Sequence, residues 1–374
     1  MKILVPFGTR PEVVKLAPVV RSLVDRGFEV RTVATGQHYD ASLTSVFYEE
    51  LGLRPDVAWT LAGTEADRVG TILTHAFSEI AEQQPDLLLC LGDTYTVPLF
   101  CMAARRHRVP VAHLEAGLRS FNPTSIEEVN RKVAAATASL HFAPTELAAR
   151  FLDDEGIAPE RVRVVGNPVI DVLRQAEVKA RPFGQRAGVV FTAHRATNVD
   201  DPERRRALVR LILDLAVEIG PVTFPIHPRT RARLEEDGAI AELERPGVTL
   251  LPPVPYAEML ELLTRTRVIV TDSGGLQEEA SWLGVPVVVL RRSTPRWEGV
   301  AAGTAVLTGV DADLALAAAK RFADPVEQAR VAAVSCPYGD GHTGQRVADL
   351  LAGGTLDELL RLDEPDFVGG HLPR

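Results

Sequence analysis

Cysteine is scarce in this chain of 374 residues. Its three copies, Cys90, Cys101 and Cys336, are too few for a disulfide framework, so we expect reduced thiols. No run of about 18 apolar residues occurs, and no segment is therefore expected to span a membrane. The apolar run at the N-terminus is too short for a signal peptide. Together these features predict a cytoplasmic protein.

Positive charge is in deficit as well. The sequence holds 41 Lys and Arg residues against 50 Asp and Glu residues, which gives a formal net charge of -9 at pH 7. This balance lacks the electrostatic footprint of nucleic-acid binding, so we expect no nucleic-acid partner. The nine histidines show no zinc-ligand spacing, and no GxGxxG fingerprint follows a candidate strand. We therefore expect neither a metal site nor a bound cofactor.

Apolar runs alternate with helical patterns along the whole chain. The expected strands are residues 3–7, 30–34, 87–91, 109–113, 140–143, 163–165, 189–192, 222–226, 248–251, 268–271, 285–290 and 305–307. Strands separated by helices predict parallel sheets joined by right-handed crossovers. Because the series occurs twice, the predicted fold class is α/β, with two doubly wound, Rossmann-like domains.

Domain bounds follow from composition. Pro, Gly and charged residues cluster at 179–188, which indicates where one domain gives way to the next. We assign residues 1–170 to an N-terminal domain and 171–354 to a C-terminal, nucleotide-binding domain, and we expect 355–374 to return to the first. Ligands in such sheets bind beyond the carboxyl ends of the strands, so polar residues at strand ends are the candidates for a site.

The stretch TDSGGLQEEA, at 271–280, follows a buried strand and starts a helix. We expect Ser273 to be the N-cap of this helix, and Gly274 and Gly275 leave its backbone N–H groups open to an anion. Glu278 and Glu279 follow within about two turns and suit ribose hydroxyls. The pattern fits a nucleotide held by its diphosphate and ribose, or a plain turn with solvated glutamates.

The stretch GTRPEVVK, at 8–15, follows the first strand. Thr9 and Glu12 have the spacing of a capping box, which begins a helix. Arg10 and Lys15 then flank the helix N-terminus, where two cations repel the helix dipole unless an anion lies between them. The alternative is a capped surface helix with two solvated cations.

Acidic residues stand at further strand and helix ends. Asp93 follows a strand, where it is either the cap of the next helix or a base. Glu115 lies in an apolar, Gly-flanked turn, where a raised pKa is possible, although Arg119 could instead pair with it in a solvated loop. Glu127 and Arg131 share one face of a helix with i, i+4 spacing, either as a surface ion pair or as an acid oriented by an arginine.

Two histidines end strands of the second domain. His194 lies in FTAHRATNV, at 191–199, and His227 in PIHPRTR, at 225–231. A single histidine is usually structural, but two at the same sheet edge favour a functional role.

These motifs resemble one family when taken in order. GTRPE, GDT, HLEAGLRS, EExNR, GNPVID, TAHR, SGGLQEE and PYGDG, which span residues 1–341, are similar to the motifs of non-hydrolysing UDP-N-acetylglucosamine 2-epimerases. The resemblance implies two domains that face each other across a cleft, in the glycosyltransferase-B type of fold, and a homodimer. It implies interconversion of the UDP-sugars UDP-GlcNAc and UDP-ManNAc by elimination of UDP to 2-acetamidoglucal and re-addition.

The resemblance also implies residue roles. The acid/base set it implies is Asp93, Glu115, Glu127 and His194. The substrate-binding groups it implies are Arg10, Lys15, Arg131, His227, Ser273, Gly274, Gly275 and Glu279. Within that second group, Glu279 corresponds to a ribose ligand, and the serine–glycine turn with the first two cations corresponds to groups near the diphosphate.

Some positions depart from the family pattern. Ala196 and Thr197 follow TAHR in place of arginine and glutamate, and Pro295 and Trp297 alter the motif TERPE. Tyr39 stands where a bacterial subset has an activator site, and we expect weak or absent activation by UDP-GlcNAc. The alternatives are a hydrolysing relative that releases free ManNAc, an epimerase of a related UDP-sugar, a glycosyltransferase of the same fold and a non-catalytic UDP-sugar-binding protein.

Overall fold

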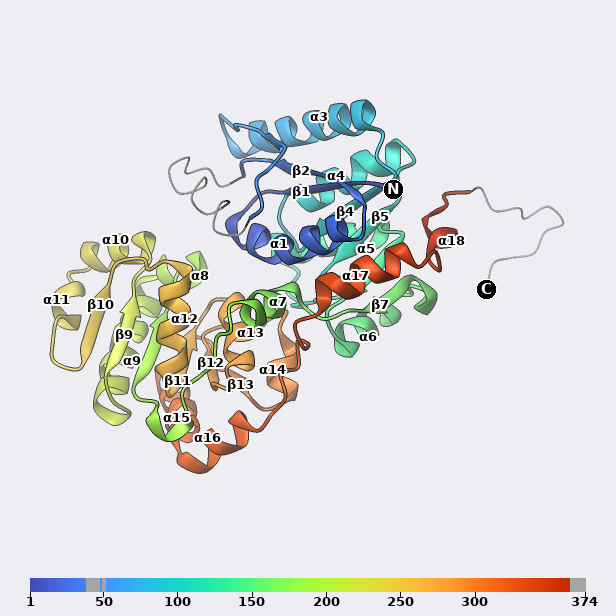
Figure 1. Ribbon diagram of the computed structural model, residues 1–374. Coiled ribbons are helices and arrows are strands. Elements are labelled where there is room, and N and C mark those ends of the chain that lie inside the picture. The colour runs from blue at the N-terminus through green and yellow to red at the C-terminus, as the bar shows by residue number, and fades with distance from the viewer. Residues whose placement is uncertain (38–47, 49–51, 364–374) are drawn as a thin grey trace. The chain divides into compact units, whose positions relative to one another are not determined.

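The computed structural model describes residues 1–37, 48 and 52–363 (Figure 1). Backbone contacts divide the chain into two compact units. The first comprises Met1–Gly117, Pro123–Pro168 and Thr343–Arg374, and the second comprises Leu118–Asn122 and Val169–His342. This grouping places 118–122 and 169–170 in the second unit, although the sequence assigned them to the first domain. It also differs from the predicted division at 343–354, which the sequence assigned to the second domain.

Helix α17 (Thr343–Ala352) accounts for that difference. It packs against α1 (Arg10–Asp25) so closely that a Cβ on Gly344 would lie 2.6 Å from the carbonyl oxygen of Pro18. Arg26 and Asp349 add an ion pair between the ends of these helices. The chain therefore rejoins the first unit at the start of α17, about twelve residues before the predicted return.

The first unit contains a seven-stranded parallel sheet with the strand order β3-β2-β1-β4-β5-β6-β7. Its strands are β1 (Lys2–Phe7), β2 (Glu29–Ala34), β3 (Val57–Ala58), β4 (Leu87–Leu91), β5 (Val111–Leu114), β6 (Leu140–Ala143) and β7 (Val162–Val164). Its helices, besides α1 and α17, are α3 (Glu65–Gln83), α4 (Thr96–Arg106), α5 (Ile126–Thr137), α6 (Glu146–Asp154) and α18 (Asp357–Leu360).

The second unit contains a six-stranded parallel sheet with the order β10-β9-β8-β11-β12-β13. Its strands are β8 (Val189–Thr192), β9 (Val222–Pro225), β10 (Val248–Leu251), β11 (Val268–Thr271), β12 (Val287–Val289) and β13 (Ala305–Leu307). Its helices are α7 (Pro168–Gln175, at the boundary), α8 (Ala196–Val199), α9 (Pro202–Glu218), α10 (Pro228–Glu236), α11 (Ile240–Leu243), α12 (Tyr256–Arg265), α13 (Gly275–Trp282), α14 (Trp297–Ala301), α15 (Ala312–Ala323) and α16 (Pro325–Ala332).

The predicted fold class, two doubly wound parallel α/β sheets, is confirmed. All the expected strands are present, with ends that shift by a few residues. The strand β3 was missed because two residues are too short to show an apolar pattern. None of the described helices is long and apolar enough to cross a membrane.

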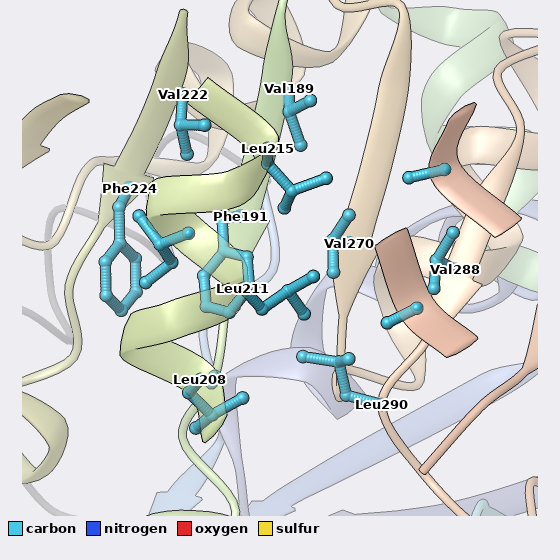
Figure 2. Close-up of a cluster of buried hydrophobic side chains, with 14 of the residues drawn as sticks. Val189, Phe191, Leu208, Leu211, Leu215, Val222, Phe224, Val270, Val288 and Leu290 are labelled. Atoms are coloured by element: carbon cyan, nitrogen blue, oxygen red, sulfur yellow. The ribbon is translucent and has the colours of Figure 1, made fainter. Parts of the chain in front are cut away.

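Alternating side chains divide the core of the second unit between the two faces of its sheet. Val189 and Phe191 of β8 pack with α9, whereas Val190 between them belongs to the cluster formed with α12 and α13. Figure 2 shows the α9 side, where Leu211 and its neighbours lie against the strand side chains. Because helices cover both faces, the strands are short and mainly apolar, as in Val287–Val289 of β12, and these apolar runs are what located the strands in the sequence.

Candidate active site

The central strands of the first sheet place several predicted residues at one edge. β1 and β4 are neighbours, and β5 lies next to β4, so their parallel carboxyl ends meet. From β1 and β4, successive strands run toward opposite edges of the sheet, and ligands of doubly wound folds bind at this switch point. Arg10 opens α1 after β1, Asp93 follows β4 and Glu115 follows β5.

Lys15 and Glu115 form a buried pair at this edge. Lys15 Nζ lies 2.5 Å from Glu115 Oε1, and Asn167 Nδ2 donates to the same oxygen at 2.9 Å. Glu115 has a φ of 59°, a left-handed conformation that costs a non-glycine residue free energy. The carboxyl therefore lies in a strained turn and is buried against Lys15 and Asn167, not solvated as the alternative interpretation had it.

Arg131 orients Asp93. Its Nε and Nη2 atoms each lie 2.9 Å from Asp93 Oδ2, and Asn130 Nδ2 donates to the Asp93 carbonyl oxygen at 2.8 Å. The N-cap of α4 is Tyr95, so Asp93 is not the cap. The second acid that bonds Arg131 is the buried Glu128, while the half-buried Glu127 accepts from the Ser125 hydroxyl.

Sequence reasoning missed Glu128, although its i, i+3 spacing from Arg131 was as clear a signal as the i, i+4 spacing of Glu127. Residue spacing could not separate the two glutamates, because both fall within reach of the same arginine. The structure separates them by burial: Glu128 is enclosed with the guanidinium, and Glu127 is the more exposed acid.

Glu12 makes hydrogen bonds beyond the capping box that the sequence indicated. Its Oε2 accepts from the amides of Gly8 and Thr9 and from the Thr9 hydroxyl, at 3.0, 2.8 and 2.9 Å, and its Oε1 accepts from the Thr94 hydroxyl at 2.9 Å. Burial raises the pKa of Glu12 to about 7, although these bonds oppose the rise. Nearby Asp93 contributes to this rise, so Glu12 keeps its proton up to near neutral pH.

In the second unit, the ends of β8, β9 and β11 carry the polar groups. His194 follows β8, and its Nδ1 lies 3.1 Å from Oδ1 of Asp272, which follows β11. His227 follows β9 as the N-cap of α10, and its ring centre lies 5.8 Å from that of His194. The two predicted histidines are therefore neighbours. Asp272 was not singled out from the sequence, although it opens the DSGG stretch.

The serine–glycine turn differs from its prediction in one respect. Gly274, not Ser273, is the N-cap of α13, so the predicted Ser273 cap is wrong. The Ser273 amide instead bonds the Thr271 hydroxyl at 2.9 Å, which turns the chain one residue later than expected. The guanidinium carbon of Arg296 would lie 3.6 Å from a Cβ on Gly274, which places a cation beside the turn.

The adjacent glutamates of α13 have different surroundings. Glu278 is fully buried, and its Oε1 accepts from Arg296 Nε at 2.9 Å. Glu279 is close to Tyr256, whose pKa is raised by burial and by this carboxylate. Only Glu279 therefore remains a candidate ribose ligand, because Glu278 neutralises a buried arginine. Arg296 was not predicted, since its motif, TPRWE, departs from the family form.

Two further points complete the site. Within residues 1–37, 48 and 52–363, no group of His, Cys, Asp and Glu side chains is arranged to hold a metal ion. Tyr39, which motivated the expectation about activation by UDP-GlcNAc, lies outside the described residues.

The sheets and their polar edges define the class. Each unit is a doubly wound parallel α/β unit with charged side chains at the carboxyl ends of its central strands, the arrangement of a nucleotide-dependent enzyme. A family model described as UDP-N-acetylglucosamine 2-epimerase matches residues 22–352. The chain belongs to the UDP-N-acetylglucosamine 2-epimerase family.

Individual relatives agree along nearly the whole length. The chain is 35% identical over 371 residues to the UDP-N-acetylglucosamine 2-epimerase of Methanocaldococcus jannaschii, covering 95% of this chain and 100% of that one. It is 34% identical over 363 residues to the UDP-2,3-diacetamido-2,3-dideoxy-D-glucuronate 2-epimerase of Pseudomonas aeruginosa, covering 94% and 99%. A crystal structure of the Methanocaldococcus jannaschii enzyme in complex with UDP-GlcNAc and UDP has a TM-score of 0.84 at 34% identity, covering 95% and 100%.

Proposed function

We propose that this protein is an isomerase that interconverts UDP-GlcNAc and UDP-ManNAc without releasing the sugar. The observation that carries the proposal is the group of acids at the carboxyl ends of β1, β4 and β5, held by Lys15, Asn167 and Arg131. Membership of the UDP-N-acetylglucosamine 2-epimerase family supplies the substrate class.

The chemistry calls for such acids. The hydrogen at carbon-2 of the sugar is adjacent to an acetal carbon, not to a carbonyl, so simple deprotonation is unfavourable. Elimination of UDP gives 2-acetamidoglucal, and re-addition of UDP returns a proton to the opposite face of carbon-2. Both directions require acid/base groups, each of which typically contributes roughly 10²–10⁴-fold to the rate.

Glu115, Asp93 and Glu127 are the proposed acid/base groups of the first unit. Their environments differ: Glu115 accepts from a lysine and an amide, Asp93 from an arginine, and Glu127 from a serine hydroxyl. Carboxyls with different partners can hold different protonation states, which a reaction that removes and returns a proton needs.

The nucleotide is proposed to bind to the second unit. The backbone N–H groups of Gly274 and Gly275 begin α13, and an anion is stabilised there by those groups and by the helix dipole. Arg296 beside the turn is proposed to donate hydrogen bonds to the leaving diphosphate, His194 to add positive charge for it, and Glu279 to bind ribose hydroxyls. His227 lies beside His194 as a further substrate-binding group.

A second candidate substrate is a UDP-sugar with a carboxylate and two acetamido groups. Specific support comes from the relative of Pseudomonas aeruginosa, whose identity to this chain is close to that of the first relative. It also comes from Trp297, which departs from the family motif and whose Nε1 donates to the Arg119 carbonyl oxygen at 2.9 Å. Arg119 belongs to the Leu118–Asn122 segment, which follows Glu115 closely in the chain.

The proposal includes the cytoplasmic location and the homodimer expected from the sequence. Light scattering of the purified chain tests the dimer, and cell fractionation tests the location.

Product identification tests the function. The enzyme is incubated separately with UDP-GlcNAc and with the diacetamido UDP-glucuronate, and the products are identified by ¹H and ³¹P NMR. We expect the 2-epimer of UDP-GlcNAc to form until equilibrium, with little free UDP. Stoichiometric free ManNAc and UDP would instead indicate the hydrolysing alternative, and conversion of the second sugar alone would reassign the substrate.

A further inference from the structure

Asp272 is among the most enclosed carboxylates of the second unit. Its side chain has no exposed surface, and it stands directly after β11, in the loop that precedes the serine–glycine turn. Thr271 before it shares a 2.6 Å hydroxyl contact with Thr192, which ties the end of β11 to the end of β8. The carboxylate is therefore fixed in position beside the segment that follows β8.

The described donors to Asp272 come from that segment. Oδ1 lies 3.1 Å from both the amide nitrogen and the Nδ1 of His194. Oδ2 accepts from the amides of His194 and Arg195, at 3.1 and 2.9 Å, and from Asn198 Nδ2 at 3.1 Å. One buried group thus fixes both the backbone and the ring of His194.

The charge of Asp272 determines which ring nitrogen carries hydrogen. Burial raises the pKa of Asp272, but the bonds from the His194 ring and from the backbone amides outweigh burial and hold that pKa below its usual value. An ionised carboxylate only accepts hydrogen bonds, so Nδ1 of His194 must be the donor. Nε2 is then the nitrogen directed away from Asp272, on a side chain that is 39% exposed.

His227 lies beside His194, and Asp272 raises its pKa by less than burial lowers it. Burial, His194 and Arg229 lower the pKa of His227, and its Nδ1 accepts from the Arg229 amide at 3.2 Å. Asp272 contacts the His194 ring directly, the ring centre of His227 lies 5.8 Å away, and Arg229, at the start of α10, is paired with Asp200. The negative charge of Asp272, in direct contact with the ring, favours a positive His194 ring.

We propose that Asp272 is a positioning residue for His194: it holds hydrogen on Nδ1, orients Nε2, and stabilises the imidazolium whose Nε2–H bonds an oxygen of the leaving diphosphate. The inference rests on the proposed function for the identity of the ligand, but the contact between His194 and Asp272 does not depend on which ligand binds. No covalent step is involved. The role resembles that of the buried aspartate in a hydrolase triad, which orients a histidine and stabilises its charged form.

The variant Asp272→Asn tests the arrangement with little change in shape. Three donors converge on Oδ2, so the amide oxygen of the variant should take that place and turn its NH₂ group toward His194 Nδ1. The ring must then accept at Nδ1, which reverses the tautomer and removes support for the imidazolium. Asn198→Ala is the matched control, because it removes one Oδ2 donor and a 2.9 Å bond to the Leu290 carbonyl but leaves the ring contact intact.

The decisive measurement is NMR of the ligand-free chain with ¹⁵N-labelled histidine, in which His194→Gln and His227→Gln assign the signals. We expect a protonated Nδ1 on neutral His194 in the unmodified chain and in Asn198→Ala. In Asp272→Asn the titration midpoint of His194 should fall by at least about one pH unit, a loss of roughly 1.4 kcal/mol of support for the charged ring. An unmodified chain with hydrogen on Nε2 alone, or an unchanged midpoint in Asp272→Asn, would overturn the proposal.

Kinetics provide a second test. Asp272→Asn and His194→Gln should each lower kcat at least tenfold, and the double variant should be no slower than the slower single variant, because both changes remove the same interaction. Multiplicative losses would show that Asp272 acts independently of His194 and would contradict the proposal. If no variant or unmodified chain turns over the sugar, the proposed function fails, while the NMR result still decides the His–Asp arrangement.

Discussion

Lys15 and Glu115 are paired across 100 residues of sequence, with Nζ 2.5 Å from Oε1 and only 10% and 5% of their side chains exposed. Charges this enclosed are stabilised by each other, and removal of one partner leaves the other buried and uncompensated. The pair therefore links the helix after β1 to the turn after β5, and it fixes the proposed base in place before any substrate binds.

Lys15→Met should destabilise the chain because the buried Glu115 carboxylate loses its lysine. We expect the free energy of unfolding to fall by about 3 kcal/mol in urea titrations. The double variant Lys15→Met/Glu115→Gln should recover most of this loss, since no buried charge remains. Lys320→Met breaks the exposed pair with Glu218 and should change stability by less than about 1 kcal/mol. Equal losses of unfolding free energy in Lys15→Met and Lys320→Met would show that the buried pair contributes no more to stability than the exposed pair.

Glu115→Gln and Glu127→Gln should separate catalysis from nucleotide binding. Because these acids are proposed to act on the sugar, we expect kcat to fall by roughly 10²–10⁴-fold, with little change in the affinity for UDP measured by calorimetry. The exposed Glu82→Gln on α3 is the control, with near-normal turnover. Near-normal turnover in both site variants would remove these residues from the acid/base set.

Glu279→Ala tests the placement of the nucleotide. Loss of a charge-assisted hydrogen bond to ribose should weaken UDP binding by roughly 1.5–3 kcal/mol, at least about tenfold in Kd. The exposed Glu258→Ala on α12 should bind UDP normally. Unchanged UDP affinity in Glu279→Ala would place the ribose elsewhere.

Glu12 gives the stability of the chain a distinctive pH dependence. Its folded pKa, about 7, lies above the ordinary value of 4.5, so between these values the folded chain holds a proton that the unfolded chain has lost. Stability should therefore fall as pH rises through this window, by about 3 kcal/mol from this group.

The variant Glu12→Gln isolates that contribution. Its amide oxygen can keep the three Oε2 donors, and its NH₂ group can donate to the Thr94 hydroxyl. Urea unfolding at closely spaced pH values should show a shallower decline between pH 4.5 and 7 for Glu12→Gln than for the unmodified chain. Parallel curves would mean that Glu12 does not titrate in this range.

The fold was predictable because it depends on patterns that a single sequence carries. Strands such as β4 and β8, buried on both faces, are uninterrupted apolar runs, and the helices between them enforce parallel order. The strand β3 and the position of α17 were not predictable in the same way. One is too short for a pattern, and the other is determined by tight packing of Gly344 on α1.

The site was only partly predictable, because strand ends can be located but side-chain partners cannot. His194 and His227 were expected to share an edge, and they do. The side-chain partners of such residues lie elsewhere in the sequence. Asp272 is 78 residues from its partner His194, and Arg296 is 18 residues from its partner Glu278. Such pairs follow from strand order and burial, neither of which local spacing specifies.

Hydrogen exchange at carbon-2 of the sugar tests the central claim most directly. Purified protein is incubated with UDP-GlcNAc in heavy water, and the UDP-ManNAc formed is examined by ¹H NMR and mass spectrometry. Elimination and re-addition predict deuterium at carbon-2 of the product, because the acid groups exchange with solvent between turnovers, together with a small release of UDP and 2-acetamidoglucal on long incubation. Product that retains its original hydrogen at carbon-2 would contradict the account.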